Sequence, residues 1–258
     1  MIRIKTLFLL SDFGTSDTYV AQMKSVILSE CPCSVVIVDL THDVEAGSVR
    51  EGAFHLYVAG KYVPAGSVVV AVVDPGVGTA RRGVVCEVEG TFYVGPDNGI
   101  FGLLPVTGAW KLPDPQEGSS STFHGRDVFA PAGARLILDP GWVKFLEPVD
   151  REDLVPSEIE EPMLEDGGLK VTVAHIDMFG NIVLWLPPSN AFHPAFLHLP
   201  DGRIEPLREV ETYSEYAGVL FLQGSQGLME IAVSCGSASE NLGLSAGDRI
   251  LLIEEFNR

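Results

Sequence analysis

Three aspartates each follow an apolar run in the first third of the sequence. Asp12 ends "LFLLSD", Asp39 follows "VVIV" and Asp74 follows "VVVAVV". An unpaired carboxylate at the end of a buried strand costs free energy. If the three runs are parallel strands, their carboxyl ends meet at one sheet edge, where open α/β folds bind ligands. Like charges there raise one another's pKa unless a positive charge is present, and Arg81, Arg82 or a cationic ligand could supply it.

Each of these aspartates also has an ordinary structural explanation. Aspartate commonly caps helix N-termini, which would suit Asp12, Asp17 and Asp39, and Asp74 precedes a Pro-Gly dipeptide typical of a turn. Capping alone accounts poorly for three carboxylates gathered at one edge. The pattern therefore favours a polar site there.

A histidine far along the chain could join this site. His124 lies in "STFHGRD", and a lone histidine in such a segment is usually a bystander. If it meets Asp74 and an arginine in space, the group could orient and deprotonate a water molecule. The glycine-rich "GVGTARRG" lacks the Lys-Ser/Thr pair of a phosphate loop, and the sequence has no local signature of a metal site. Phosphate binding is therefore set aside, and water activation depends on whether His124 meets Asp74 in space.

The elements that would position these side chains alternate along the first half of the chain. Apolar runs alternate with "YVAQMKSVILSE" and "SVREGAFHLYVAGKYV", which have helical spacing. This rhythm predicts an α/β domain over residues 1–150, with a mainly parallel sheet and helices on both faces. Two short strands should flank a Glu-Gly turn in "GVVCEVEGTFYVG", and a helix should cover "GRDVFAPAGARLIL", with Pro131 in its first turn or at a kink.

The second half of the chain has a different pattern. Residues 151–167 are rich in Pro, Glu and Asp with little periodicity, which predicts a linker. From residue 168 to 258, short runs of β-forming residues alternate with Gly, Pro and Asn turns. This pattern predicts a smaller, all-β barrel domain.

Composition limits the partners. The formal net charge of −18 disfavours nucleic acid and anionic membranes, and favours either solubility alone or a cationic small molecule. The first apolar run is too short to span a membrane and lacks a cleavage site. Cys31, Cys33, Cys86 and Cys235 have neither zinc-site spacing nor the density of a disulfide scaffold. We therefore expect free thiols in a reducing cytoplasm.

Six segments together resemble one protein family. They are "SDFGTSDTYVAQMKSVI", "DLTHDV", "VVDPGVGTARR", "GPDNG", "TFHGRDVFAPAGA" and "IDMFGN". In this order they are similar to the S-adenosylmethionine (SAM) hydroxide adenosyltransferases, which are SAM hydrolases related to the fluorinase and the SAM-dependent chlorinase. The resemblance implies an N-terminal α/β domain and a C-terminal β-barrel. It also implies a homotrimer with active sites between one subunit's first domain and the next subunit's second, and SAM as substrate without a cofactor.

The resemblance also implies roles for individual residues. Asp74, Arg81 and His124 would hold and activate water. The implied substrate contacts are Asp12 at the ribose hydroxyls, Asp17 near the methionine amino group, Phe123 and Tyr213 lining the nucleoside pocket, Asp177, Phe179 and Asn181 at the methionine and adenine ends, and Ser225 and Glu230 closing the pocket. For Phe123 and Tyr213, core packing is an equal alternative.

Several positions bear on the choice between water and halide. In the fluorinase an aromatic residue replaces Asp74, so the aspartate favours water. Gly125 stands where the fluorinase has a halide-binding serine, but the chlorinase has glycine there, so this position does not decide. The chain departs from the family pattern at Leu184 and Trp185, which replace a Thr-Asn pair, at Gly224, which replaces an Asn, and in the "SCGS" after "EIA". These departures affect the substrate contacts expected from the second domain.

The predicted reaction is hydrolysis of SAM at ribose C5′ to adenosine and L-methionine. Methionine leaves a sulfonium as a neutral thioether, so only the nucleophile needs assistance, through positioning and a general base. Three alternatives remain open: a halide adenosyltransferase, a non-catalytic SAM or adenosine binder, and a structural oligomer whose acids only cap helices.

Overall fold

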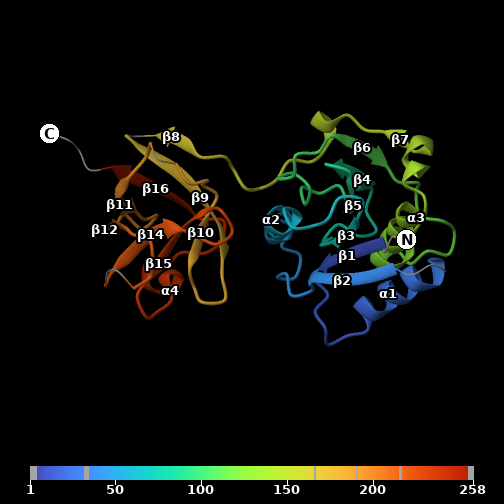
Figure 1. The fold of residues 1–258 in the computed structure, drawn as a ribbon, viewed down its shortest axis with the longest axis horizontal. Coiled ribbons are helices and arrows are strands. Elements are labelled where there is room, and N and C mark those ends of the chain that lie inside the picture. Colours follow the sequence, from blue (N-terminus) through green and yellow to red (C-terminus); the bar gives the residue numbers. More distant parts are fainter. Residues whose placement is uncertain (1–4, 32–34, 166, 190, 215–216, 255–258) are drawn as a thin grey trace. The chain divides into compact units, whose positions relative to one another are not determined.

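The chain forms two structural units. The computed structural model describes residues 5–31, 35–165, 167–189, 191–214 and 217–254. Unit 1 spans Met1–Glu158 and unit 2 spans Ile159–Arg258 (Figure 1). Each unit has its own sheet and its own apolar core.

Unit 1 is built on a seven-stranded sheet with the order β2-β1-β3-β5-β4-β6-β7. The strands are β1 (Lys5–Ser11), β2 (Val35–Thr41), β3 (Val68–Val72), β4 (Gly83–Val88), β5 (Thr91–Pro96), β6 (Gly108–Lys111) and β7 (Glu147–Pro148). Strands β2, β1, β3 and β5 run parallel, whereas β4, β6 and β7 join in antiparallel pairs. The predicted α/β class is confirmed, and the sheet is mixed because of this antiparallel edge.

Helices pack on both faces of this sheet (Figure 1). They are α1 (Tyr19–Glu30), α2 (Val49–Gly60) and α3 (Ala130–Leu138). One face of β1 and β3, including Leu9 and Val70, packs with α1 and α3. The opposite face, including Leu10 and Val69, packs with α2. Burial on both faces explains why these strands are apolar at nearly every position.

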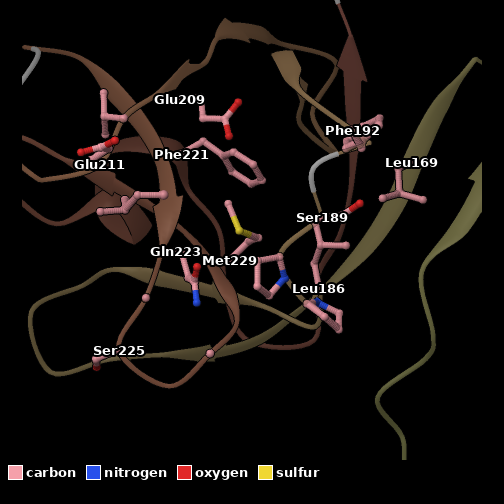
Figure 2. Close-up of a pocket in the computed structure, with 16 residues that line it drawn as sticks. Leu169, Leu186, Ser189, Phe192, Glu209, Glu211, Phe221, Gln223, Ser225 and Met229 are labelled. Atoms are coloured by element: carbon pink, nitrogen blue, oxygen red, sulfur yellow. The ribbon is translucent and has the colours of Figure 1, made fainter.

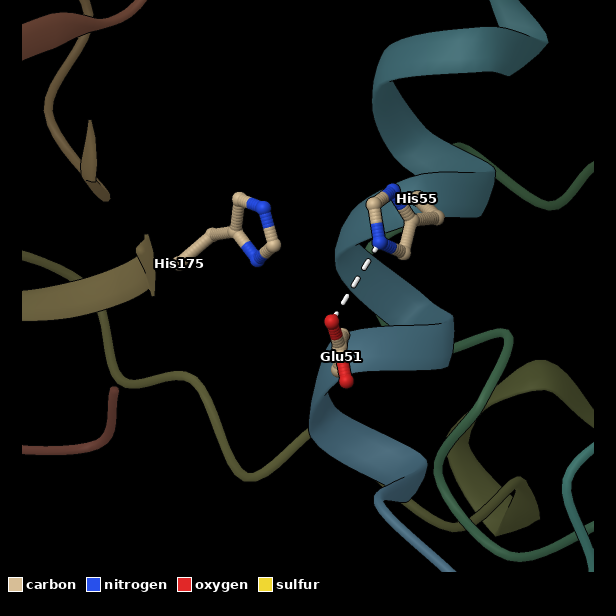
Figure 3. Close-up of side chains that lie close together, drawn as sticks. All are labelled: Glu51, His55 and His175. Carbon is tan, nitrogen blue, oxygen red and sulfur yellow. Dashed lines mark ion pairs between the residues drawn. The ribbon is translucent and has the colours of Figure 1, made fainter. Parts of the chain in front are cut away.

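Two helices begin at residues whose types favour a helix start. The Ser48 side chain accepts a hydrogen bond from Glu51 N at the start of α2, and Glu51 forms an ion pair of 3.5 Å with His55 one turn later (Figure 3). At α3, a π-helical turn η1 (Gly125–Phe129) comes first and Pro131 lies in the first turn of the α-helix. Proline fits there because its missing N–H has no partner to lose.

Unit 2 is built on a nine-stranded, barrel-like sheet with the order β12-β11-β16-β9-β10-β15-β14-β13, and β8 pairs with β9 (Figure 1). The strands are β8 (Met163–Glu165), β9 (Gly168–Ile176), β10 (Ile182–Leu184), β11 (Pro194–His198), β12 (Ile204–Pro206), β13 (Arg208–Glu209), β14 (Val219–Gln223), β15 (Met229–Val233) and β16 (Arg249–Glu254). A short helix, α4 (Ala238–Leu242), packs into the core of the barrel. Its C-terminus is closed by Gly243 in the left-handed conformation.

Short elements complete the chain. Two 3-10 turns, η2 (Pro140–Phe145) and η3 (Arg151–Asp153), end unit 1, and η3 and β8 lie in the segment 151–167 for which the sequence predicts a linker. None of the helices in the described part of the chain has the length and apolar character needed to cross a membrane. Cys86 and Cys235 are free thiols, Cys31 is buried with its Sγ 3.7 Å from Ala134 O, and Cys33 lies outside the described residues.

Candidate active site

Asp74 lies just beyond the buried strand β3, at the start of a tight loop. Val77 N donates to Asp74 O at 3.2 Å, and Thr79 N donates to Gly76 O at 3.1 Å. Gly78 has φ +77°, and a Cβ there would lie 2.6 Å from the Ser121 carbonyl oxygen. Only glycine therefore fits at this point of the loop. The loop reverses the chain and brings Arg81 back to Asp74.

Arg81 and Asp74 form a buried ion pair. Arg81 Nε donates to Asp74 Oδ1 at 2.9 Å and to Oδ2 at 3.0 Å, and Arg81 Nη2 donates to Oδ2 as well. The two side chains are 11% and 5% exposed. This forked arrangement fixes the carboxylate geometrically and compensates its charge. The neighbouring Arg82 pairs instead with Asp97, at 2.5 Å.

His124 completes a three-residue cluster. Its Nδ1 lies 2.8 Å from Arg81 Nη2. A guanidinium can only donate, so Nδ1 accepts and the proton of the neutral ring is on Nε2. Burial and then the charge of Arg81 lower the pKa of His124, although Asp74 and Asp127 act in the opposite direction. The structure thus brings the three predicted catalytic residues together.

The segment around His124 is itself held in place. His124 is the residue before the π-helical turn η1, and Phe129 at the end of that turn lies under Arg81, with the guanidinium carbon 5.1 Å from the ring centroid. Asp127 accepts a hydrogen bond from Ser120 N at 2.8 Å, which ties the preceding loop to the turn. Asp127 was not predicted as a site residue, although it lies in the "TFHGRD" segment.

The substrate residues predicted in unit 1 lie around the end of β1. Ser11 pairs in register with Val72 of β3, so Asp12 and Asp74 both follow neighbouring parallel strands. Asp12 Oδ2 accepts a hydrogen bond from Gly47 N at 2.8 Å. Asp17 is exposed in the turn before α1.

Phe123 belongs to a group of three aromatic rings beside this strand end. Its ring centroid lies 5.6 Å from that of Phe13 and 5.2 Å from that of Tyr19, both edge-on. A Cβ at Gly125 would lie 3.2 Å from the Phe123 ring, so the rings fill the space there. Phe13 and Tyr19 were not predicted as site residues, although both lie in the segment "SDFGTSDTYV" that resembles the family.

Asp39 differs from the expectation drawn from its apolar run. It lies within β2, paired in register with Leu9, rather than beyond the strand end. Lys24 Nζ donates to Asp39 Oδ2 at 2.6 Å. Burial opposes ionisation of Asp39, but hydrogen bonds from Lys24 and His42 outweigh it and lower the pKa. Asp39 therefore has its own cation and does not join Asp74.

In unit 2 the predicted substrate residues share one pocket. It has a volume of about 880 Å³, and its lining includes Asp177, Phe179, Asn181, Tyr213, Ser225 and Glu230. These residues come from the β9–β10 loop, the segment after β13, and the β14–β15 hairpin. Residues spread over 54 positions of sequence, from 177 to 230, thus meet around one cavity.

The acids of this pocket are held by hydrogen bonds. Asp177 Oδ1 accepts from the backbone N of Phe179 and of Asn181, both at 2.9 Å. Tyr213 Oη donates to Glu230 Oε1. Burial and the charge of Asp177 raise the pKa of Glu230, although the Tyr213 hydrogen bond opposes this. The hydrogen bond to Glu230, followed by burial, raises the pKa of Tyr213 to about 12.

The departures from the family pattern have different structural explanations. A Cβ at Gly224 would overlap Glu230 Oε2, so the glycine makes room for the carboxylate. Leu184 is fully buried in the barrel core, and Trp185 is 7% exposed with Nε1 3.2 Å from Glu161 Oε1. Among the described residues, the pocket lining includes neither of these two side chains. Of the departures, Ser234, Cys235 and Gly236 of "SCGS" line the pocket directly, and Gly224 acts on it through the Glu230 carboxylate.

A second cavity of about 660 Å³ lies on the same unit. Figure 2 shows Phe221 and Met229 pointing into it, with Glu209 and Glu211 on one side. Ser225 is the only predicted site residue among those that line it. The predicted residues thus favour the other pocket as the candidate site of unit 2.

Comparison with known proteins agrees with this geometry. The model of the SAM hydroxide adenosyltransferase N-terminal domain matches residues 7–141, and that of the C-terminal domain matches residues 171–251. A Thermus thermophilus protein named (R)-S-adenosyl-L-methionine hydrolase is 38% identical, over 97% of this chain and 100% of its own. A Nocardia brasiliensis fluorinase is 27% identical, over 67% of this chain and 68% of its own.

The fold has a close counterpart among solved structures. The crystal structure of an uncharacterized conserved protein from Thermotoga maritima superposes with a TM-score of 0.85 at 27% identity, covering 96% of this chain and all of that one. Matches to both domain models and nearly full-length similarity to a hydrolase confirm the predicted resemblance. The chain belongs to the SAM hydroxide adenosyltransferase family.

Proposed function

We propose that the protein hydrolyses SAM to adenosine and L-methionine. A water oxygen forms a bond to ribose C5′ while the C5′–S bond breaks, and the sulfonium takes the electron pair and leaves as the neutral thioether of methionine. One proton of the water goes to a base in the site. The observation that carries this proposal is the contact of Arg81 with both Asp74 and His124.

The three residues would divide the work. Asp74, whose charge Arg81 compensates, would accept a hydrogen bond from the water and then its proton, because a carboxylate oxygen can accept more than one hydrogen bond. His124, with its proton on Nε2, would hold the water oxygen. General base assistance of this kind is worth roughly 10²–10⁴ in rate, and alignment with the C5′–S bond adds to it.

The remaining predicted residues would bind the substrate. Asp12 would accept hydrogen bonds from the ribose hydroxyls, Asp17 would face the methionine amino group, and Phe123 would line the nucleoside pocket. The pocket of unit 2 would enclose the rest of the ligand, where Asp177 and Glu230 supply negative charge. Carboxylates in a partly dry pocket favour a ligand that carries sulfonium and ammonium charges.

We further propose a cytoplasmic homotrimer in which unit 1 of one subunit and unit 2 of the next form each active site. The family resemblance supports this, and each unit carries only part of the predicted set of substrate residues. In this proposal SAM is the substrate and the reaction uses neither a metal nor another cofactor. The net charge of −18 supports the absence of nucleic acid and membrane partners.

The test is to incubate the protein with SAM in ¹⁸O-water, with and without chloride or fluoride. We expect adenosine carrying ¹⁸O at its 5′-hydroxyl under all conditions, because Asp74 stands where the fluorinase has an aromatic residue. A 5′-halo-5′-deoxyadenosine product would identify a halide adenosyltransferase instead. Tight adenosine binding without turnover would identify a non-catalytic binder. The Asp97→Asn variant, which alters the neighbouring arginine pair, is the control that should keep its activity.

A further inference from the structure

A second histidine–aspartate cluster lies next to the proposed catalytic residues in unit 1. Ser11 Oγ lies 2.7 Å from His42 Nδ1, His42 Nε2 lies 3.1 Å from Asp39 Oδ1, and Lys24 donates to the other oxygen of Asp39. The contacts run from serine to histidine to aspartate, as in the catalytic triad of a serine hydrolase. The cluster therefore needs an explanation of its own.

Burial excludes nucleophilic catalysis by this serine. Ser11 is fully buried and His42 is 5% exposed, so a substrate carbonyl cannot approach the serine oxygen. The hydrogen positions point to a structural connection instead. Phe13 N donates to Ser11 Oγ at 3.3 Å, so the hydroxyl hydrogen is available for His42 Nδ1. The imidazole hydrogen is then on Nε2, facing Asp39.

The cluster fixes both ends of the turn that carries Asp12. The His42 side chain binds Ser11 at the start of the turn, and the His42 carbonyl accepts a hydrogen bond from Gly14 N at 2.7 Å at its end. Asp12 lies between these two anchors, and its own Oδ2 accepts from Gly47 N. A single buried residue therefore holds the backbone on each side of the carboxylate.

We propose that His42 is a positioning residue, which acts through Ser11 to aim the Asp12 carboxylate at the ribose hydroxyls of a nucleoside ligand. This inference rests on the proposed function, because it takes from it the contact between Asp12 and the ribose. Asp39 Oδ1 lies 3.1 Å from His42 Nε2 on the other side of the ring, and Lys24 contacts the second oxygen of Asp39. The conformational entropy of the Asp12 side chain is then lost during folding, so less entropy is lost when the ligand binds.

The test compares two ligands by calorimetry: adenosine, and 2′,3′-dideoxyadenosine, which lacks the hydroxyls. Ser11→Ala, which removes one atom, should weaken adenosine binding about tenfold, the effect of one misplaced charge-assisted hydrogen bond. It should change dideoxyadenosine binding less than twofold. His42→Ala should do the same, and His42→Asn, whose side-chain oxygen can accept from Ser11, should recover part of the loss. Ser67→Ala, a buried serine at the opposite end of the same sheet, should affect neither ligand.

A double-mutant cycle separates positioning from general stability. In an Asp12→Ala background, Ser11→Ala should cause no further loss of adenosine affinity, because its effect passes through that carboxylate. Equal losses for both ligands, or additive losses in the double variant, would overturn the positioning role while the wild type still hydrolyses SAM. A wild type that binds neither nucleoside and leaves SAM intact would overturn the proposed function, and the positioning role with it.

Discussion

The polar groups of the two units are arranged in opposite ways. In unit 1 three acids have cations of their own: Asp74 has Arg81, Asp97 has Arg82 and Asp39 has Lys24, whereas Asp12 accepts from the Gly47 amide. In the pocket of unit 2, the contacts seen within the described residues give Asp177 amide donors and Glu230 a phenol. The pKa of His124 is lowered in the first region, and that of Glu230 is raised in the second.

This difference indicates what each region is ready to receive. A cluster whose charges already compensate one another suits a neutral reactant such as water. A pocket whose acids lack a cation suits a ligand that brings positive charge, and binding would relieve the repulsion between Asp177 and Glu230. Four experiments test this contrast, beginning with the variant expected to have the largest effect.

The Asp74→Asn variant should lose activity by a factor of roughly 10²–10⁴, because the amide cannot take a proton from water. SAM should still bind, because the substrate contacts proposed above do not include Asp74 or Arg81. Rapid-quench measurement of adenosine gives the rate, and calorimetry gives the affinity.

Asp97→Asn is the matched control for that variant, since it changes the adjacent arginine pair in the same way. Both variants should lose about 1–3 kcal/mol of unfolding free energy, the worth of a hydrogen-bonded charge. Equal loss of activity in the two would show that Asp74 acts only through stability.

The Gly224→Ala variant should raise the KM for SAM about tenfold with little change in kcat. The added methyl group displaces the Glu230 carboxylate, which costs one charge-assisted contact. Gly236→Ala, in the lining of the pocket that contains Glu230, is the steric control, because its Cβ would meet only the Val233 side chain, at 3.5 Å. A kcat effect larger than the KM effect in Gly224→Ala would contradict the separation of the two regions.

The Tyr213→Phe variant should raise the KM for SAM by only about threefold, because it removes one neutral donor and leaves both acids in place. It should also move the acid limb of the KM profile to higher pH, since the lost hydrogen bond is the one that lowers the pKa of Glu230. An unchanged KM profile would show that Glu230 does not contact the ligand.

The pH dependence of the wild type gives the smallest effect. Since the pKa of His124 lies below the ordinary value of 6.5, kcat at pH 6.5 should exceed half of its plateau, and it should fall only at lower pH as the ring is protonated. KM should rise as pH falls, starting above the ordinary glutamate value of 4.5, because protonation of Glu230 removes negative charge. A kcat at half of its plateau at pH 6.5 would show that Arg81 and burial do not act on the ring.

Much of the fold follows from local sequence. The continuous apolar runs predict strands buried on both faces, and the Glu-Gly turn between β4 and β5 appears with both residues at positive φ, 49° for Glu89 and 78° for Gly90. Proline in the first turn of α3 was likewise readable. These features depend on neighbours along the chain, so the sequence contains the information directly.

The candidate site was less accessible to sequence reasoning. The family segments pointed to Asp74, Arg81 and His124, but the choice of Arg81 over Arg82 depends on the path of the loop through Gly78. Asp39 was misjudged because its partner Lys24 is 15 residues away on a helix. The role of Gly224 depends on where the Glu230 side chain lies on the next strand. Residue spacing alone does not reveal this contact.

Because of the π-helical turn before α3, the direction of the His124 side chain depends on how many residues separate it from α3. In this turn Ala130 N donates to Gly125 O, five residues back, instead of four. Removing one residue between 125 and 129 would shift the segment before it by one residue relative to α3, a rotation of about 100° and a rise of about 1.5 Å. His124 would then turn away from Arg81, so a one-residue deletion would abolish the contact on which the proposed activity depends.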